Sequence, residues 1–565
     1  MKPNLKPIFR ASAAVVFLEL LLAGCAGSAG SGGSAGSTGT AGALGRGGSV
    51  GSAGSGTGGG STGESGGVGA TGTGGTVGVA GTTGTGGAAG AGGATGTAGT
   101  GGAGGTTGTA GGVGRGGTVG TGGAAGTGNV GGTGGSAGRG GSAGTGGPGG
   151  AGGAGGAAGV EMLAARPSMG WESWWSGHTG VSTEADIKAT ADAMASKLLP
   201  YGYNYILIDD GWYDGFDQYG RWKPDLKKFP DGWAGTAAYV HSKGLKIGIY
   251  LTPGVNDTVV AANSPIEGTS YHVKDIVTTA AGNTDKATGA TARKIDFTKP
   301  GAVDFVQGYA NLISGWGADN VKMDFVGPGG GGGNADNQDD IMQWRAALDK
   351  TGRQIWLNLS NKLNISAIAT WQKYSNAWRV ENDVECYCST DTDWAHVVRE
   401  INGLPPFAPY AGPGHWNDLD SLMIGNGSFD GITPDERQTM FSFWALATSP
   451  LIIGADITKL DAADLAILTN SEVIAVNQAA VPPRAVSTAT SQQVWYSQQK
   501  DGSVVVGLFN FGSASAQVTA SFSAVGAASS MSVRDLVTHT DLGRSTGSFA
   551  ATLATHASRL VRLTP

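Results

Sequence analysis

Glycine is distributed so unevenly along the chain that one part of it is excluded from any compact fold. Of the 105 glycines in the 565 residues, 65 lie between residues 26 and 160, a stretch with no aromatic residue and only four charged ones. Its few apolar side chains cannot offset the entropy lost on ordering so many glycines. It also lacks the glycine at every third position that a collagen helix needs. We therefore predict a disordered linker over residues 26–160.

The remainder, residues 161–565, holds all 15 tryptophans and is long enough for one large domain and a small one. Six of the 36 basic residues and two of the 43 acidic residues precede it, which leaves 30 and 41, a balance of −11. An acidic protein repels the phosphate backbone of nucleic acids, so we exclude them as partners. Neutral or cationic ligands are expected, and no protein partner is predicted.

The first 25 residues have the layout of an export signal. A basic start precedes an apolar run over residues 11–22, which is too short to span a bilayer. The run ends in Leu22-Ala-Gly-Cys25, which resembles the bacterial lipobox, whose cysteine is lipidated and becomes the mature N-terminus. We expect an exported protein, either a bacterial cell-surface lipoprotein anchored only through Cys25 or, with an ordinary cleaved signal, a secreted one.

Apolar strand-like runs alternate with helical stretches over residues 161–480. Eight strand candidates are separated by amphipathic segments such as 183–199, 234–243, 301–316 and 339–350; the candidates begin near residues 167, 204, 245, 320, 354, 378, 415 and 450. This alternation predicts a (β/α)8 TIM barrel, whose active site would lie at the C-terminal ends of the strands. Residues 481–565 contain short alternating runs bounded by turn residues, which predict a small antiparallel β-sandwich domain.

Aspartates cluster where the barrel model places the ends of its strands. They are Asp209, Asp210, Asp324, Asp383, Asp418 and Asp420, and aromatic residues such as Trp171 and Tyr250 accompany them. A single aspartate at a strand end is usually a turn or cap residue. Four strand ends carrying carboxylates beside aromatic rings instead indicate a pocket that binds sugar hydroxyls and stacks on sugar faces, so we expect a carbohydrate substrate.

Two of these carboxylates have a basic neighbour on the same strand. Lys322 and Asp324 are two residues apart, so both point into the barrel mouth, where the ammonium would keep the carboxylate ionised as a nucleophile requires. A purely structural ion pair is the alternative. Asp383 follows Arg379, and a raised pKa there would let it act first as an acid and then as a base. Retaining glycoside hydrolysis needs two such carboxyls about 5–5.5 Å apart.

Six motifs occur in order between about residues 166 and 480. They are Pro167-Ser-Met-Gly-Trp-Glu-Ser-Trp174, Ile208-Asp-Asp-Gly-Trp212, Tyr239-Val-His-Ser-Lys-Gly-Leu-Lys-Ile-Gly-Ile-Tyr250, Val321-Lys-Met-Asp324, Trp378-Arg379 with Asp383, and Gly414-His-Trp-Asn-Asp-Leu-Asp420. Together they resemble the motif series of glycoside hydrolase family 27, the α-galactosidases and α-N-acetylgalactosaminidases.

This resemblance implies double displacement with retention, with no cofactor and no metal. It implies Asp324 as nucleophile and Asp383 as acid/base. The sugar site would then be lined by Trp171, Asp209, Asp210, Tyr250, Lys322, Arg379 and Asp420. The adjacent pair Asp209 and Asp210 would take the 4- and 6-hydroxyls, which favours galactose.

The chain departs from the family pattern on its fifth strand. Ser360 and Asn364 stand at the two positions expected to contact the 2-substituent of the sugar, in place of a carboxylate-bearing motif and an aromatic residue, and Ser421 replaces the usual methionine. An α-galactosidase remains our first hypothesis. The alternatives are an α-N-acetylgalactosaminidase, a β-L-arabinopyranosidase, an isomaltodextranase, or a surface carbohydrate-binding protein without catalysis.

Besides Cys25 the chain has two cysteines, Cys386 and Cys388. An even number of cysteines in an oxidising compartment favours a disulfide between them. A bridge between residues two apart closes a small, strained ring, so two free thiols are the alternative. Two cysteines alone make a poor metal site, and no histidine pair has ligand spacing.

Overall fold

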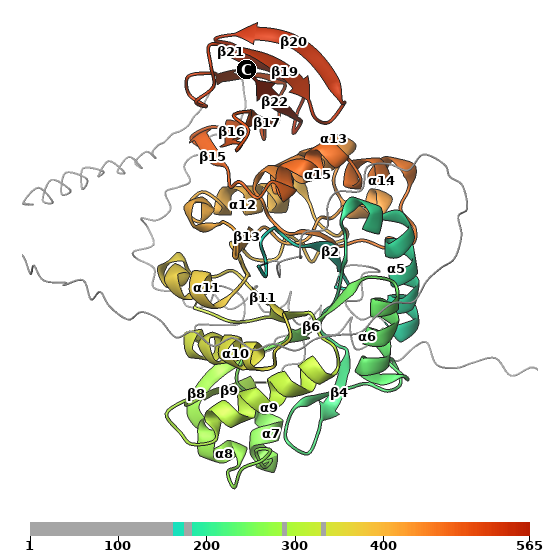
Figure 1. The fold of residues 1–565 in the computed structure, drawn as a ribbon, viewed down its shortest axis with the longest axis vertical. Helices are drawn as coiled ribbons and strands as arrows, with labels where there is room; N and C mark the ends of the chain where they lie inside the picture. The colour runs from blue at the N-terminus through green and yellow to red at the C-terminus, as the bar shows by residue number, and fades with distance from the viewer. Residues whose placement is uncertain (1–161, 175–182, 285–290, 329–334) are drawn as a thin grey trace, which may run out of the picture. The chain divides into compact units, whose positions relative to one another are not determined.

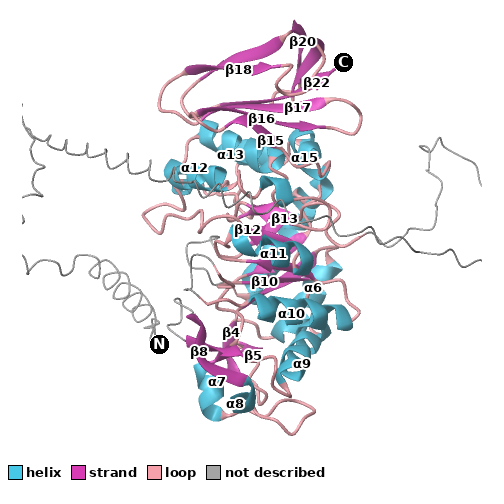
Figure 2. Ribbon diagram, turned by 90° about the vertical axis from the view of Figure 1, so that its left-hand side faces the viewer, coloured by secondary structure: helices cyan, strands magenta, loops and turns pink. Residues whose placement is uncertain are grey.

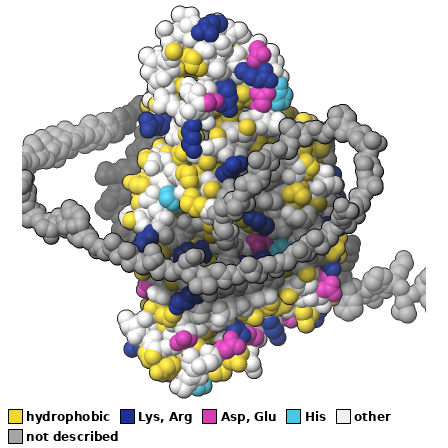
Figure 3. Space-filling view, viewed as in Figure 1, with side chains coloured by type: hydrophobic (Ala, Val, Ile, Leu, Met, Phe, Trp, Pro, Cys, Tyr) yellow, Lys and Arg dark blue, Asp and Glu magenta, His cyan; other side chains and the backbone are white. Residues whose placement is uncertain are grey.

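The computed structural model describes residues 162–174, 183–284, 291–328 and 335–565 (Figure 1). Residues 1–160 lie outside the described residues. The signal peptide, the lipidation of Cys25 and the linker over residues 26–160 therefore stay predictions. Among the residues that are described, no helix is long and apolar enough to cross a membrane. On the face seen in Figure 3, lysine and arginine side chains are scattered among acidic and apolar ones.

Eight parallel strands form the central sheet, in the order β13-β12-β11-β10-β6-β3-β2-β14. Their bounds are β2 (Met169–Glu172), β3 (Tyr205–Ile208), β6 (Lys246–Leu251), β10 (Asn320–Met323), β11 (Trp356–Leu359), β12 (Ala377–Arg379), β13 (Trp416–Asp418) and β14 (Leu451–Ile453). Leu422, which follows β13, forms a parallel bridge with Ile453 of β14 and so connects the two ends of the sheet. The predicted barrel is therefore confirmed, with all eight strands within a few residues of their expected positions.

Helices lie outside the strands (Figures 1 and 2). Their bounds are α5 (Glu184–Lys197), α6 (Gly232–Ser242), α9 (Ala302–Gly315), α10 (Gln338–Lys350), α11 (Ile368–Tyr374), α12 (Trp394–Gly403), α13 (Pro434–Leu446), α14 (Ala462–Leu468) and α15 (Ser471–Gln478), with short 3-10 turns η5 (Leu199–Tyr201), η6 (Ile365–Ala367), η7 (Ala408–Tyr410) and η8 (Gly427–Asp430). Helix α5 shows why such a segment starts where it does: Thr183 and Asp186 form a capping box that satisfies the first free backbone amides.

Two small sheets interrupt the barrel after its second and third strands. Strands β4 (Tyr213–Phe216) and β5 (Trp222–Pro224) pair after β3. After β6 come β7 (Val255–Asn256), α7 (Asp257–Ala262), α8 (Val273–Ile276), β8 (Val277–Thr284) and β9 (Thr291–Ile295), with the sheet order β7-β9-β8. These additions were not predictable from the sequence, because their strands lack apolar alternation. Both lie on the strand-to-helix side of the barrel, where active sites form.

The C-terminal part is an antiparallel domain, as predicted. Its larger sheet has the order β15-β16-β17-β22-β19-β20 and its smaller one pairs β18 with β21. The bounds are β15 (Arg484–Ser487), β16 (Gln492–Gln498), β17 (Val504–Asn510), β18 (Ala516–Ser521), β19 (Ser530–Asp535), β20 (Thr540–Thr546), β21 (Ser548–Leu553) and β22 (Ser558–Thr564).

Strand β17 is buried on both of its faces. Val504, Val506 and Leu508 belong to the core inside the sandwich. Val505 and Phe509 belong instead to the main cluster that includes the barrel. Alternate side chains of a strand point to opposite faces, so this one sheet packs against two cores. Phe443 of α13 reaches it, with ring centroids 5.3 Å from Trp495 and 5.2 Å from Phe509.

Candidate active site

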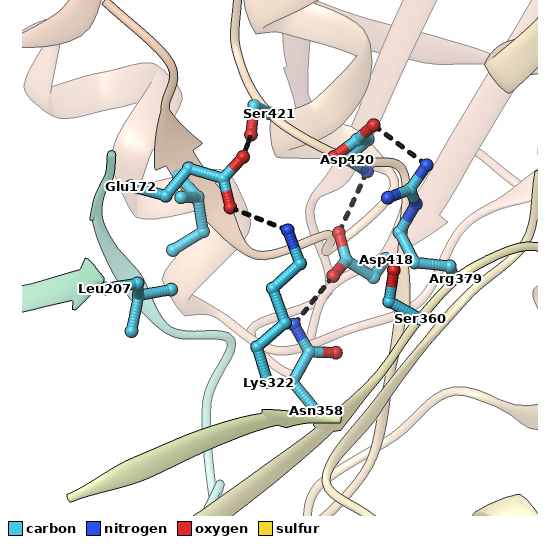
Figure 4. Close-up of a pocket in the computed structure, with 10 residues that line it drawn as sticks. Glu172, Leu207, Lys322, Asn358, Ser360, Arg379, Asp418, Asp420 and Ser421 are labelled. Atoms are coloured by element: carbon cyan, nitrogen blue, oxygen red, sulfur yellow. Dashed lines mark hydrogen bonds and ion pairs between the residues drawn. The ribbon is translucent and has the colours of Figure 1, made fainter. Parts of the chain in front are cut away.

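The predicted acidic residues gather at one end of the barrel. Asp209 and Asp210 follow β3, Asp324 follows β10, Asp383 lies four residues beyond the end of β12, and Asp420 follows β13. The carboxyl ends of parallel barrel strands share one face. Figure 4 shows a pocket that forms part of this site. The pocket is lined by Glu172, Leu207, Lys322, Asn358, Ser360, Arg379, Asp418, Asp420, Ser421 and Ile452.

Lys322 is shared by two buried carboxyl groups. Its Nζ lies 2.6 Å from Asp209 Oδ2 and 3.2 Å from Glu172 Oε2. Burial alone would lower the pKa of the lysine, but the charges of Asp209 and Glu172 raise the pKa well above its usual value. Lys322 therefore remains an ammonium at any physiological pH, and it holds the side chain of Asp209.

Asp324 does not form the direct pair with Lys322 that its sequence spacing suggested. Its Oδ2 accepts a hydrogen bond from the Tyr250 hydroxyl at 3.2 Å, and its Oδ1 accepts one from the backbone amide of Phe325 at 2.8 Å. Burial raises the pKa of Asp324 to about 6, while the nearby charge of Lys322 acts in the opposite direction. Asp324 is therefore mostly ionised at neutral pH, with its carboxylate oriented by two donors.

Asp383 is surrounded by hydrogen-bond donors. Its Oδ1 accepts from Arg379 Nη2 and from Asn361 Nδ2, each at 3.2 Å, and its Oδ2 accepts from the Tyr387 hydroxyl at 2.6 Å. Burial raises the pKa of Asp383, but the charge of Arg379 and the hydrogen bond from Tyr387 outweigh it and hold the pKa below its usual value. This is the reverse of the raised pKa that the sequence analysis expected for an acid.

Arg379 connects Asp383 to Asp420. Its Nη2 lies 2.8 Å from Asp420 Oδ2, and both side chains are nearly inaccessible, at 3% and 5% exposure. The same oxygen of Asp420 accepts a hydrogen bond from the backbone amide of Val384 at 2.8 Å. Asp420 therefore anchors both the guanidinium and the backbone of the segment that carries Asp383.

The other predicted residues have different surroundings. Trp171 is buried and donates through Nε1 to the carbonyl of Ala455 at 2.8 Å. Asp210 accepts from the Tyr213 hydroxyl at 2.6 Å. Ser360 lines the pocket, whereas Asn364 is exposed and does not: its side chain accepts from the backbone amide of Ser366 as the N-cap of η6. The pocket lining thus does not include Asn364, and it does not include Asp324 or Asp383 either.

Glu172 is a site residue that the sequence analysis missed. It lies at the end of β2 and is 4% exposed. Besides the contact with Lys322, its Oε1 accepts a hydrogen bond from the Ser421 hydroxyl. Burial raises the pKa of Glu172 to about 7, although Lys322 opposes this shift. The sequence feature that could have identified Glu172 is its position beside Trp171, in a motif at the end of a strand.

Cys386 and Cys388 are joined by a disulfide, and their Cα atoms are 5.2 Å apart. The bridge lies just beyond Asp383, on the segment that Asp420 anchors. Within the four described ranges, no group of three or more histidine, cysteine, aspartate or glutamate residues is arranged to hold a metal ion. The carboxyl groups of the site are positioned by Lys322, Arg379 and Tyr250.

Known proteins similar to this chain share both parts of its fold. The family model described as alpha galactosidase A matches residues 166–286 and 288–479, and the model of the alpha galactosidase C-terminal beta sandwich domain matches residues 489–563. Alpha-galactosidase 3 of Arabidopsis thaliana is 35% identical over 419 residues, which cover 71% of this chain and 83% of the relative. The alpha-galactosidase of Coffea arabica is 34% identical over 71% of this chain and 95% of its own length.

A solved structure extends this likeness to bacteria. The family 27 β-L-arabinopyranosidase of Geobacillus stearothermophilus has a TM-score of 0.66 and 29% identity, over 71% of this chain and 97% of that one. The family models match the barrel and the sandwich in the order in which the structure contains them. The chain belongs to glycoside hydrolase family 27.

Proposed function

We propose that the protein is a retaining α-galactosidase that removes terminal α-D-galactosyl residues by double displacement. The observation that carries this proposal is the convergence of Asp324 and Asp383 at one end of the barrel, each held by its own set of donors. The α-galactosidases of Arabidopsis thaliana and Coffea arabica, each at least 34% identical over most of their length, support the choice of sugar.

In the proposed first step, Asp324 attacks the anomeric carbon and Asp383 gives a proton to the leaving oxygen. The bond between the anomeric carbon and the leaving oxygen breaks while a bond to Asp324 forms. In the second step, Asp383 takes a proton from water, the water oxygen bonds to the anomeric carbon, and the bond to Asp324 breaks. The pKa of about 6 leaves Asp324 ionised for the attack at neutral pH.

Lys322 and Arg379 would stabilise the sugar site through the groups they hold. Lys322 fixes Asp209, which is proposed to accept a sugar hydroxyl, and Arg379 fixes both Asp383 and Asp420. These buried contacts pre-organise the carboxyl groups, so little reorganisation is required when substrate binds.

Asp324→Asn and Asp383→Ala test the two roles on an activated aryl α-galactoside. We expect Asp324→Asn to lose at least about a thousandfold in kcat, the scale seen when a covalent catalyst is removed. Asp383→Ala should retain the first step with a good leaving group, accumulate the glycosyl-enzyme, and recover turnover with azide, yielding an α-galactosyl azide.

Asp435→Asn is the matched control, because this aspartate is exposed in the first turn of α13. It should keep wild-type kcat and KM. Turnover close to wild type in either active-site variant would overturn the proposed roles.

A second candidate activity is the hydrolysis of β-L-arabinopyranosides, favoured by the structural likeness to the enzyme of Geobacillus stearothermophilus. This sugar has the galactose arrangement without the 6-hydroxymethyl group. Comparing kcat/KM on aryl α-D-galactoside and aryl β-L-arabinopyranoside decides between the two, with the α-N-acetylgalactosaminide and an isomaltose-type dextran as further substrates. The larger kcat/KM identifies the main activity.

We also propose that the enzyme is exported and anchored by a lipid on Cys25. The support for this is the basic start, the short apolar run and the Leu22-Ala-Gly-Cys25 ending. The glycine-rich linker would then act as a flexible tether, with a root-mean-square span of roughly 60–70 Å for a coil of this length.

A further inference from the structure

Tyr387 lies inside the small ring closed by the Cys386–Cys388 disulfide. Its φ of 49° is in the left-handed region, which residues other than glycine rarely adopt. Residues in such sparsely populated conformations are concentrated at active sites and ligand-binding segments. The bridge restricts how far the chain on either side can relax, so it keeps the tyrosine in this conformation.

The hydroxyl of Tyr387 contacts the proposed acid/base directly. The residue is 58% exposed, yet its hydroxyl donates to Asp383 Oδ2 at 2.6 Å. The main chain of Asp383 is fixed as well, because Arg399 of α12 donates to its carbonyl. The partly exposed carboxylate and the exposed ring therefore meet at the outer side of the site.

The two oxygens of Asp383 have different surroundings. Oδ1 accepts from Arg379 and Asn361, whose donor groups cannot receive a proton from the carboxyl group. Among the contacts described above, Oδ2 has one, which is the hydrogen bond from the Tyr387 hydroxyl on the exposed side of the carboxylate. The oxygen that gives a proton to the leaving group is therefore Oδ2, in the position that the tyrosine hydroxyl now occupies.

We propose that Tyr387, held by the Cys386–Cys388 bridge, is a positioning residue that occupies Oδ2 of Asp383 and gives up this place to the leaving-group oxygen of the substrate. This inference rests on the proposed glycosidase function. When substrate displaces the hydroxyl, Asp383 loses one donor, and its affinity for a proton increases at the moment the proton is needed.

The displacement reconciles the lowered pKa of Asp383 with its proposed role. Once Tyr387 has moved, Asp383 binds a proton from solvent at Oδ2 and passes it to the glycosidic oxygen as the bond to the anomeric carbon breaks. The carboxylate that remains then takes a proton from the attacking water. Other charged or titratable groups act on Asp383 and must stay unchanged in the test: Lys322, Asp324, Arg379, Glu385, Arg399 and Asp420.

Tyr387→Phe removes only the hydroxyl and keeps the ring. For a phenyl α-galactoside, whose leaving group needs protonation, the acidic limb of kcat/KM follows the lower of the two carboxyl pKa values, which is that of Asp383. This limb should shift upward by about half to one pH unit. For a 2,4-dinitrophenyl α-galactoside, which leaves without a proton, Tyr387→Phe should change the profile little. Replacing both Cys386 and Cys388 by serine should shift the limb in the same direction by a smaller amount.

Tyr201→Phe is the matched control, because Tyr201 is also exposed but lies in η5, on the helix-to-strand side of the barrel. It should leave the limb in place. Carboxyl ¹³C resonances of labelled aspartate, with Asp383 assigned from Asp383→Asn, give the pKa of Asp383 without substrate; this pKa should rise in Tyr387→Phe.

The outcomes separate the inference from the proposed function. An active Tyr387→Phe enzyme with an unshifted limb and an unchanged Asp383 pKa overturns the inference alone. A shift of the same size in Tyr201→Phe also overturns it. Wild-type protein that hydrolyses neither glycoside overturns the proposed function and, with it, the catalytic role of Tyr387.

Discussion

Glu172→Gln should remove a pH dependence of stability that the barrel otherwise has. Lys322 supplies one positive charge to two buried carboxyl groups, Glu172 and Asp209. One ammonium cannot compensate two buried carboxylates, and burial raises the pKa of Glu172 from 4.5 to about 7. Glutamine has nearly the same shape and can still accept from Ser421, but it does not titrate.

The sign and size follow from proton linkage. Because the folded-state pKa is raised above the unfolded value, the folded protein binds more protons between pH 4.5 and about 7. The free energy of unfolding therefore falls as the pH rises through this window. A shift of two and a half pH units at about 1.4 kcal/mol per unit corresponds to about 3.5 kcal/mol in all, of which about 3 kcal/mol is lost above pH 4.5. The Glu172→Gln variant should not show this decrease in unfolding free energy, because glutamine does not titrate.

Urea unfolding followed by tryptophan fluorescence at pH 4.5 to 8.5 measures the effect. The difference in unfolding free energy between Glu172→Gln and wild type should rise by about 3 kcal/mol, in favour of the variant, from the acidic to the basic end. Glu472→Gln is the control, since hydrogen bonds from Arg534 lower the pKa of Glu472 below 4.5, so its stabilisation is lost only below the measured range. The difference between this variant and wild type should stay nearly constant from pH 4.5 to 8.5. Parallel pH curves for Glu172→Gln and wild type would refute the reasoning.

Two further predictions concern the sandwich and the N-terminus. Phe443→Ala should lower the unfolding free energy by about 3–5 kcal/mol, because a 1% exposed ring packed against Trp495 and Phe509 leaves a cavity between barrel and sandwich; a loss below about 1 kcal/mol in urea unfolding would contradict this. Cys25→Ala should abolish incorporation of radiolabelled palmitate in a bacterial host and release the protein from the membrane fraction, and a variant that stays in that fraction would contradict the lipid anchor.

The barrel was predictable because its strands are apolar runs bounded by turn residues. The run at 204–210 contains β3, and the run at 245–252 contains β6. The hairpin and the small sheet after these strands were not predictable, since their strands are polar and their pairing is set by tertiary context. The placement of Asn364 follows a local preference that the family resemblance does not indicate. Asparagine favours helix N-caps, and here it caps η6.

The sequence indicated which strand ends carry the acidic residues, but it did not give the contacts between them. Spacing along β10 correctly indicated that Lys322 points into the barrel mouth with Asp324. Its partners, however, come from residues 113 and 150 positions away, and the registers of the neighbouring strands decide which carboxyl group it meets. Tyr387 carried no signal, because nothing in the sequence places it against Asp383.

Because β17 is buried on both faces, the chain is harder to divide into separate barrel and sandwich domains than its sequence suggests. Sequence comparison recognises the barrel and the sandwich as separate modules, with a natural cutting point near residue 480. The side chains do not follow that division, because Val505 and Phe509 belong to the same cluster as the barrel. A barrel expressed without the sandwich would expose the surface around Phe443 to water. Anyone exchanging the C-terminal module, in the laboratory or in evolution, must therefore also redesign the outer face of α13.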